Sequence, residues 1–273
     1  MELKNKVAVV TGGASGIGLG IAERFIAEGA AHVAIVDLNV DLVGTEAARI
    51  GASGHVVDVS DETAIKQLVD EVEMNHGPID VFVSNAGYVT VGGLEVDNAE
   101  ITDMFDVHVM SHVYAARAVV PGMIERGNGY LLNTASAAGL LTQIGSLAYS
   151  VTKHAAVSLG EWLSVTHGHQ GIKVSVLCPQ AVATNIGVNS PSVGALGTGA
   201  GVASGDGVLS PAELADVVID AMAEERFLVL PHPEVETYAK RKADDIDRWL
   251  GGMRRFQTRL FPDGPGPGEW LTA

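Results

Sequence analysis

A tyrosine and a lysine stand four residues apart in a stretch with no other charged side chain. Tyr149 and Lys153 lie in "TASAAGLLTQIGSLAYSVTKHAA", residues 134–156, and Ser136 precedes them. Residues four apart share one face of a helix. A free phenol has a pKa of about 10, and a neighbouring cation lowers it by favouring the phenolate. The pattern predicts a tyrosine that exchanges a proton with a substrate oxygen, to which Ser136 is hydrogen-bonded.

The same spacing also suits a buried aromatic ring beside a lysine whose stem lies along an apolar surface. The choice between these interpretations depends on the other motifs of the chain.

A glycine-rich turn near the start of the chain predicts a dinucleotide site. Gly12, Gly16 and Gly18 lie in "VAVVTGGASGIGLG", between a short apolar run and a helical pattern. Glycines let the backbone approach a pyrophosphate, which the unpaired N–H groups of the helix N-terminus hold. A purely structural turn has the same composition, but the strand before it and the helix after it favour binding.

An acidic residue ends the second apolar run, about twenty residues beyond the glycine loop. Asp37, in "AIVDL", would accept hydrogen bonds from the adenosine ribose and repel a 2′-phosphate. Neither the loop nor the stretch directly after Asp37 contains arginine or lysine. We therefore predict NAD rather than NADP as the cofactor. The oxidised nicotinamide ring of NAD would add positive charge beside Tyr149. The alternative role for Asp37 is a turn at a strand end.

The elements that position these residues alternate along the chain. Runs rich in β-branched residues precede longer helical patterns, and strands that are apolar on both faces predict a parallel sheet covered on both sides. We predict a single doubly wound, Rossmann-type α/β domain with three α/β/α layers over residues 1–273. The expected strands are 6–12, 32–38, 54–60, 79–87, 129–136, 172–179 and 226–233, and the expected helices are 16–30, 40–50, 62–77, 101–127 and 148–168.

Two segments depart from this alternation. Residues 185–210 are mostly small and uncharged, which favours a substrate lid over a surface insertion. Residues 234–273 predict a helical extension followed by a Pro/Gly tail. The cations of the extension would meet an anionic substrate or, with nearby aspartates, a second subunit. These residues are Lys240, Arg241, Lys242, Arg248, Arg254, Arg255 and Arg259, with Asp244, Asp245 and Asp247.

Composition limits the classes of partner. The formal net charge of -16 would repel nucleic acid and anionic membranes. The single cysteine, Cys178, excludes an internal disulfide and a cysteine-based zinc site. No signal-peptide pattern or membrane-spanning run is present in the sequence. We expect a cytoplasmic protein with a small-molecule substrate, no metal, and neither nucleic acid nor membrane as partner.

Several motifs, taken in order, resemble the short-chain dehydrogenase/reductase family. They are "TGGASGIG" at 11–18, "DV" at 58–59, "NAG" at 85–87, Ser136 and "YSVTK" at 149–153, within a match over about residues 4–232. The resemblance implies a Rossmann-type NAD(P)-dependent oxidoreductase, often a homotetramer, so we expect a tetramer or dimer. It implies Ser136, Tyr149 and Lys153 as the catalytic residues.

The resemblance also implies positions for the cofactor. Asp58 would lie beside the adenine, Asn85 beside the cofactor ribose, Lys153 on the ribose hydroxyls, and the Val182 backbone near the nicotinamide carboxamide. The expected cofactor-binding residues are Gly12, Ser15, Gly16, Ile17, Gly18, Asp37, Asp58, Val59, Asn85, Ala86, Gly87, Tyr149, Lys153, Pro179, Val182 and Thr184.

Two positions depart from the family pattern. His108 stands where members carry an asparagine that helps hold a water linking the lysine to solvent, and Ser111 stands where they carry glycine. His108 could keep that geometry, relay protons itself as a fourth catalytic residue, or be a packed helix residue. In "PQAVAT", at 179–184, Gln180 replaces a glycine and could line the substrate pocket or face the surface.

The residues expected around the substrate are mostly apolar. This favours a hydrophobic secondary alcohol or ketone over a sugar. We therefore predict an NAD-dependent oxidoreductase that transfers a hydride between nicotinamide and such a substrate. The alternatives are a 3-hydroxyacyl thioester dehydrogenase and a dinucleotide-binding sensor without turnover. The expected substrate contacts are Leu141, Gln143, Gln180 and Ile186, with Tyr88, Leu140, Val193 and Leu196 as further candidates.

Overall fold

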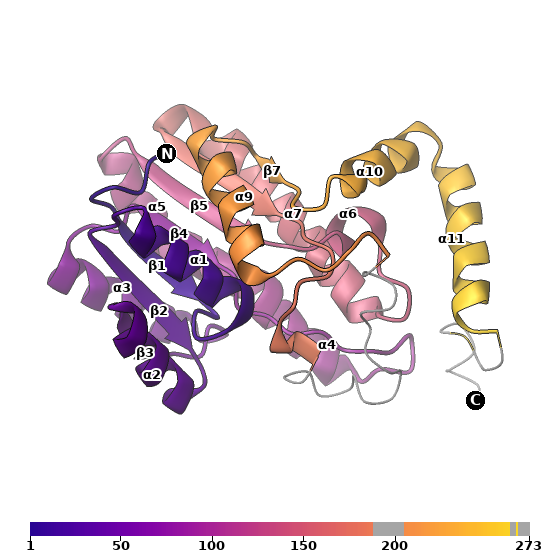
Figure 1. The fold of residues 1–273 in the computed structure, drawn as a ribbon, viewed down its shortest axis with the longest axis horizontal. Coiled ribbons are helices and arrows are strands. Elements are labelled where there is room, and N and C mark those ends of the chain that lie inside the picture. Colours follow the sequence, from indigo (N-terminus) through magenta and orange to yellow (C-terminus); the bar gives the residue numbers. More distant parts are fainter. Residues whose placement is uncertain (188–204, 263–265, 267–273) are drawn as a thin grey trace.

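A seven-stranded parallel sheet forms the centre of the protein (Figure 1). The computed structural model describes residues 1–187, 205–262 and 266. The strand order is β3-β2-β1-β4-β5-β6-β7, which confirms the predicted doubly wound α/β fold. The strands are β1 (Val7–Thr11), β2 (His32–Asp37), β3 (Ser53–Val56), β4 (Val81–Ser84), β5 (Gly129–Thr134), β6 (Ile172–Leu177) and β7 (Leu228–Val229).

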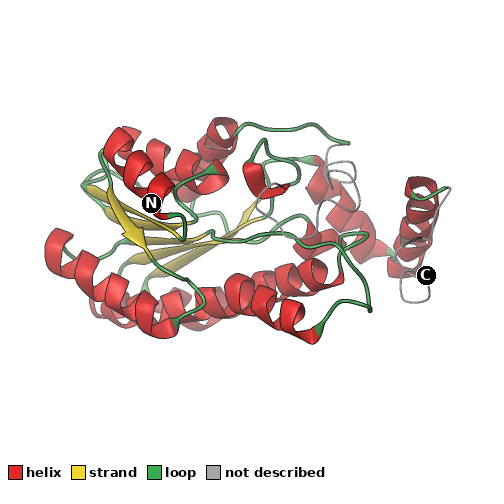
Figure 2. Ribbon diagram, turned by 90° about the horizontal axis from the view of Figure 1, so that it is seen from below, coloured by secondary structure: helices red, strands yellow, loops and turns green. Residues whose placement is uncertain are grey.

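Helices cover both faces of the sheet (Figure 2). One face packs against α1 (Gly16–Ala27), α2 (Val40–Ile50) and α9 (Pro211–Ala223). The other packs against α3 (Glu62–His76), α5 (Ser111–Glu125) and α7 (Leu147–His167). The shorter helices are α4 (Asn98–Phe105), α6 (Ala138–Leu141) and the 3-10 turns Gly168–Gln170 and Asn185–Gly187.

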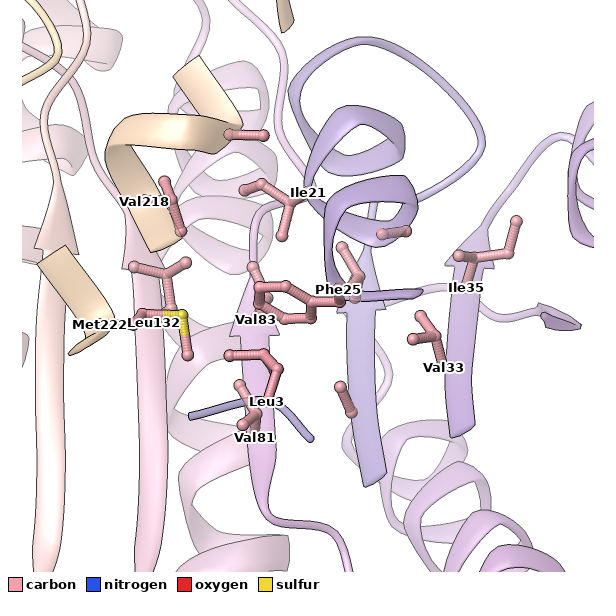
Figure 3. Close-up of a cluster of buried hydrophobic side chains, with 14 of the residues drawn as sticks. Leu3, Ile21, Phe25, Val33, Ile35, Val81, Val83, Leu132, Val218 and Met222 are labelled. Atoms are coloured by element: carbon pink, nitrogen blue, oxygen red, sulfur yellow. The ribbon is translucent and has the colours of Figure 1, made fainter. Parts of the chain in front are cut away.

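The apolar strands predicted from the sequence form the core. Every residue of β1 and β4 is buried, as expected for central parallel strands. Figure 3 shows Ile21 and Phe25 of α1 above Val83 of β4, with Val218 of α9 beside them. The edge strand β3 instead alternates between half-buried and exposed residues. Its hydrophobic pattern is therefore weaker than that of the central strands.

The order of the strands creates one particular edge for a ligand. Strands β2 and β3 lie on one side of β1, and β4 to β7 lie on its other side. The strand order therefore reverses between β1 and β4. In such sheets ligands bind beyond the carboxyl ends of the strands at this reversal. Gly12, Asn85, Ser136 and Pro179 follow β1, β4, β5 and β6 at this edge.

The helix expected at 101–127 is interrupted. It consists of α4, a π-helical turn at Asp106–Met110, and α5. A π turn adds a residue to the helical repeat and occurs often at functional sites. His108 lies at the centre of this turn and is completely buried.

The extension after residue 233 forms two helices, α10 (Glu234–Asp244) and α11 (Ile246–Leu260). They meet at Asp245, whose extended backbone ends α10 and whose side chain accepts a hydrogen bond from Arg248 N at 2.9 Å. Helix α11 stands apart from the sheet in Figure 1. Within the described ranges, none of the helices has the length and apolar character that crossing a bilayer requires.

Only the ends of the predicted lid, residues 185–187 and 205–210, are among the described residues. Val193 and Leu196 lie outside them.

Candidate active site

The glycine loop has a backbone that only glycine fits. Gly12 and Gly16 have φ values of 62° and 52°, in the left-handed region. A Cβ on Gly18 would lie 2.2 Å from the carbonyl oxygen of Gly12. The absence of these side chains brings the loop against the N-terminus of α1, whose first N–H groups have no helical partner. These features fit the pyrophosphate of a dinucleotide.

Asp37 is held beside the glycine loop. Its carboxylate accepts hydrogen bonds from the N–H groups of Ala14 at 3.3 Å and Asn39 at 3.1 Å. The structure thus brings this acid from the end of β2 to the loop, as the ribose interpretation requires. Asp58 follows β3 and accepts hydrogen bonds from the N–H of Ser60 at 2.9 Å and its hydroxyl at 2.7 Å.

A buried threonine that the sequence analysis missed joins β1 to β4. The Thr11 hydroxyl donates to Val83 O at 3.2 Å and accepts from the N–H groups of Asn85 at 2.8 Å and Ala86 at 3.1 Å. The Asn85 amide donates to Thr11 O at 3.0 Å and accepts from the Thr134 hydroxyl at 3.1 Å. Asn85 is therefore fixed between the ends of β1 and β5.

Lys153 extends this network to α7. Its ammonium donates to Thr134 O at 3.1 Å and lies 5.6 Å from the centroid of the Tyr149 ring. Burial lowers the pKa of Lys153 to about 8. The side chain thus remains mostly charged at neutral pH while lying almost wholly out of water.

The side chains of Tyr149 and Ser136 lie within hydrogen-bonding reach of each other. Burial raises the pKa of Tyr149, and a hydrogen bond with Ser136 only partly opposes this. The predicted lowering of this pKa requires Lys153 together with oxidised nicotinamide, so it stays a prediction for the complex with the cofactor. Ser136 Oγ also accepts from Ala138 N at 3.1 Å.

His108 joins the turn after β4 to α7. Its Nε2 accepts from Tyr88 N at 3.2 Å, and its Nδ1 lies 3.0 Å from the Thr152 hydroxyl. That hydroxyl donates to Ala148 O, so the proton of the imidazole belongs on Nδ1. Burial, assisted by the charge of Lys153, holds the pKa of His108 well below its usual range. Both ring nitrogens of a neutral histidine are thus engaged, which suits a supporting role better than proton relay.

A second histidine, one turn along the helix, was not singled out from the sequence. His112 is buried, and neither of its ring nitrogens has a hydrogen-bond partner among the described residues. Burial, together with the charge of Lys153, lowers its pKa to about 3. Its position four residues after His108 was the available signal. In the described part of the chain, no group of His, Cys, Asp or Glu side chains is arranged to hold a metal ion.

The segment after β6 returns to the glycine loop. A Cβ on Gly16 would lie 3.0 Å from Cγ2 of Thr184, so "PQAVAT" reaches the predicted cofactor side. Val182 bridges to Leu209 in this segment. The side-chain amide of Gln180 donates a hydrogen bond to the carboxylate of Asp206 at 2.9 Å, so this amide is held by another residue of the protein.

The remaining expected substrate residues are divided between two places. Leu141 and Gln143 line a cavity against α11. Ile186 is exposed at the start of the predicted lid.

Cys178 is buried, which raises the pKa of its thiol to about 12 and leaves it unreactive.

The family model described as "short chain dehydrogenase" matches residues 6–192. The chain is a short-chain dehydrogenase/reductase. As such it is an oxidoreductase of hydroxyl or keto groups in a family that uses nicotinamide cofactors.

This short-chain dehydrogenase/reductase has relatives similar over most of its length. It is 34% identical over 259 residues to the 1-deoxy-11-beta-hydroxypentalenate dehydrogenase of Streptomyces exfoliatus, covering 91% of this chain and 90% of the relative. It is 36% identical over 194 residues to the 3beta-hydroxysteroid dehydrogenase 2 of Eggerthella lenta, covering 68% and 74%. A short-chain dehydrogenase/reductase from Burkholderia phymatum, solved in complex with NAD, superposes with a TM-score of 0.82 at 27% identity, covering 90% and 96%.

Proposed function

We propose that this protein is an NAD-dependent dehydrogenase/reductase of apolar secondary alcohols and ketones, with Tyr149 exchanging the proton. The observation that carries this proposal is the meeting of Ser136, Tyr149 and Lys153 at the sheet edge that also holds the glycine loop and Asp37. Two relatives are named for substrates that carry a hydroxyl group, a hydroxypentalenate and a hydroxysteroid, which supports oxidation of an alcohol.

The residues around the loop fit NAD. The backbone of Gly12, Gly16 and Gly18 would receive the pyrophosphate, and Asp37 would accept hydrogen bonds from the adenosine ribose. Asn85 and Lys153 would lie toward the second ribose. Bound NAD would accept the hydride in alcohol oxidation and supply it, as NADH, in ketone reduction.

The proton moves through Tyr149. In oxidation the phenolate oxygen takes the proton of the alcohol, while Ser136 donates a hydrogen bond to the same oxygen. Because burial raises the pKa of Tyr149, its resting form at neutral pH is the phenol, which can protonate a ketone oxygen. Ketone reduction should therefore be favoured at neutral pH and alcohol oxidation at alkaline pH.

His108 serves this site as a positioning residue. Its contacts with Tyr88 and Thr152 tie the turn after β4 to the helix that carries Tyr149 and Lys153. A Cβ on Gly87 would lie 3.0 Å from its Nε2 and 3.7 Å from Nζ of Lys153. The imidazole of His108 and the ammonium of Lys153 thus both lie close to Gly87.

The protein should also form a homo-oligomer. Three large apolar side chains on one face of α7 are exposed, namely Val151 at 53%, Trp162 at 58% and Val165 at 83%. An apolar stripe of this kind is costly in water and marks an interaction surface. Light scattering after gel filtration should give a mass above that of one chain, and Val165→Asp should lower it.

The decisive assay follows absorbance of reduced nicotinamide. NAD or NADP is offered with cyclic and steroidal secondary alcohols and a 3-hydroxyacyl-coenzyme A, with Tyr149→Phe as the test variant and Tyr114→Phe as the matched control. We expect reduction of NAD by an apolar alcohol, lost only in Tyr149→Phe. Preference for the coenzyme A ester would favour the thioester alternative. Tight NAD binding without any turnover would favour a sensor.

A further inference from the structure

A cavity of about 450 Å³ separates α11 from the loop that leads from Ser136 to Tyr149. Its size is in the range of pockets that enclose small molecules. Ser150 and Val151, directly after Tyr149, contribute to its wall. Most of the lining is apolar, with Leu141, Ile144 and Leu147 from the loop and Trp249, Leu250 and Met253 from α11.

The charged side chains of this cavity are both cations. They are Lys242 of α10 and Arg254 of α11, and no carboxylate lies among its described lining residues. The whole chain, by contrast, has 33 acidic and 17 basic residues. An apolar cavity that collects only cations in an acidic protein is complementary to an apolar anion.

Neither cation is neutralised within the described part of the chain. The Lys242 ammonium donates to Leu140 O at 2.6 Å and lies 3.5 Å from Nε2 of His154, and burial lowers its pKa. Arg254 is exposed and forms no ion pair with a described residue. Its guanidinium can present two N–H groups to a carboxylate.

We propose that the substrate is an apolar carboxylic acid, whose hydrocarbon body lies against Trp249 and Met253 and whose carboxylate binds Arg254 and Lys242. This inference rests on the proposed function, since the cavity adjoins the proposed active site through Ser150 and Val151, directly after Tyr149. The cavity shares its inner wall with the loop between Ser136 and Tyr149, which places the anionic end of the substrate on the α11 side. A neutral alcohol would offer neither cation an opposite charge.

The binding test uses Trp249 as a reporter, because its indole lines the cavity. The full-length protein is titrated with 1-adamantanecarboxylate and with its neutral isostere, 1-adamantanecarboxamide, and tryptophan fluorescence is followed. We expect the carboxylate to bind about tenfold more tightly, the effect of one charge-assisted hydrogen bond. The signal should be lost in Trp249→Phe. Persistence of the signal in that variant, or equal affinity for the two ligands, would overturn the proposal.

Two arginines that follow one another on α11 provide a matched pair. Arg254→Gln should bring the affinity ratio close to one, whereas Arg255→Gln, which changes an exposed arginine outside the cavity, should leave it near tenfold. Equal losses in the two variants would indicate a general charge effect and contradict a site at Arg254. Lys242→Gln is expected to lower the ratio as well.

The dehydrogenase proposal and the carboxylate site can be tested independently of each other. Tyr149→Phe should abolish turnover and keep the tenfold preference for the carboxylate, because Tyr149 does not line the cavity. With the wild-type protein, a cyclic hydroxy acid should have a higher kcat/KM than its methyl ester, mainly through a lower KM. Turnover with equal kcat/KM for acid and ester would keep the enzyme and refute the carboxylate site.

Discussion

Replacing Thr11 by valine tests how the active-site edge is held together. Valine has nearly the same shape as threonine but offers no acceptor to the N–H groups of Asn85 and Ala86. Leaving a buried donor without a partner costs about 1–3 kcal/mol. Two such donors give an expected loss of about 2–6 kcal/mol in the free energy of unfolding, which is large against the total of about 5–15 kcal/mol that is typical of a folded protein.

The matched control is Thr11→Ser, which keeps the hydroxyl and removes one buried methyl group at a cost of about 1 kcal/mol. Unfolding in urea, followed by circular dichroism at one protein concentration, gives both losses. Calorimetric titration with NAD then shows whether the misplaced Asn85 also weakens cofactor binding. We expect Thr11→Val alone to raise the NAD dissociation constant.

One result would refute this reasoning. If Thr11→Val is as stable as Thr11→Ser and binds NAD equally well, the turn after β4 does not depend on the three hydrogen bonds of the hydroxyl. The position of Asn85 would then have to be ascribed to its side-chain contacts with Thr11 O and Thr134.

Other predictions concern the cofactor, the glycines and pH. Asp37→Ser should shift the ratio of kcat/KM for NAD and NADP toward NADP by about tenfold or more, because a charged acceptor and a repulsive charge are both lost; an unchanged ratio would contradict the ribose role. Gly18→Ala should abolish NAD binding in a calorimetric titration, since its Cβ meets Gly12 O at 2.2 Å. Gly44→Ala, in exposed helix with no atom within 4 Å of the new Cβ, should bind NAD normally and gain about 0.5–1 kcal/mol in thermal unfolding. The folded pKa of His112 is about 3 against 6.5 unfolded, so the unfolded chain takes up the proton first and stability falls as pH drops from 6.5 toward 3. Urea unfolding of His112→Gln should show a slope smaller by up to about 1.4 kcal/mol per pH unit, and an unaltered slope would show that His112 is not buried neutral.

The sequence predicted the features that depend on local pattern and residue chemistry. The central strands could be located because β1 and β4 are buried on both faces and hence continuously apolar. The sequence also predicted that Ser136 and Tyr149 act on one substrate oxygen; their side chains lie within hydrogen-bonding reach of each other, and their catalytic roles stay predictions. The half-exposed strand β3 gave a weaker signal, and its observed bounds are Ser53–Val56 rather than 54–60.

Features set by tertiary packing could not be predicted in this way. A threonine at a strand end is common, and the role of Thr11 depends on a turn 74 residues away. The burial that raises the pKa of Tyr149 arises from the whole surrounding protein. Likewise, the sequence showed the cations of α10 and α11, but only the position of α11 opposite the loop at 141–147 reveals that Arg254 shares a cavity with Lys242.

The hydrogen bonds from Thr11 through Asn85 and Thr134 to Lys153 have a consequence for folding kinetics. Their successive partners are 74, 49 and 19 residues apart, so these bonds connect Lys153 to the first strand through contacts between distant parts of the chain. Such contacts carry a large loop-closure entropy and form late, after local helices. Refolding molecules would thus regain helical content well before catalytic competence, and a newly made chain would acquire its chemistry only when the centre of the sheet is complete.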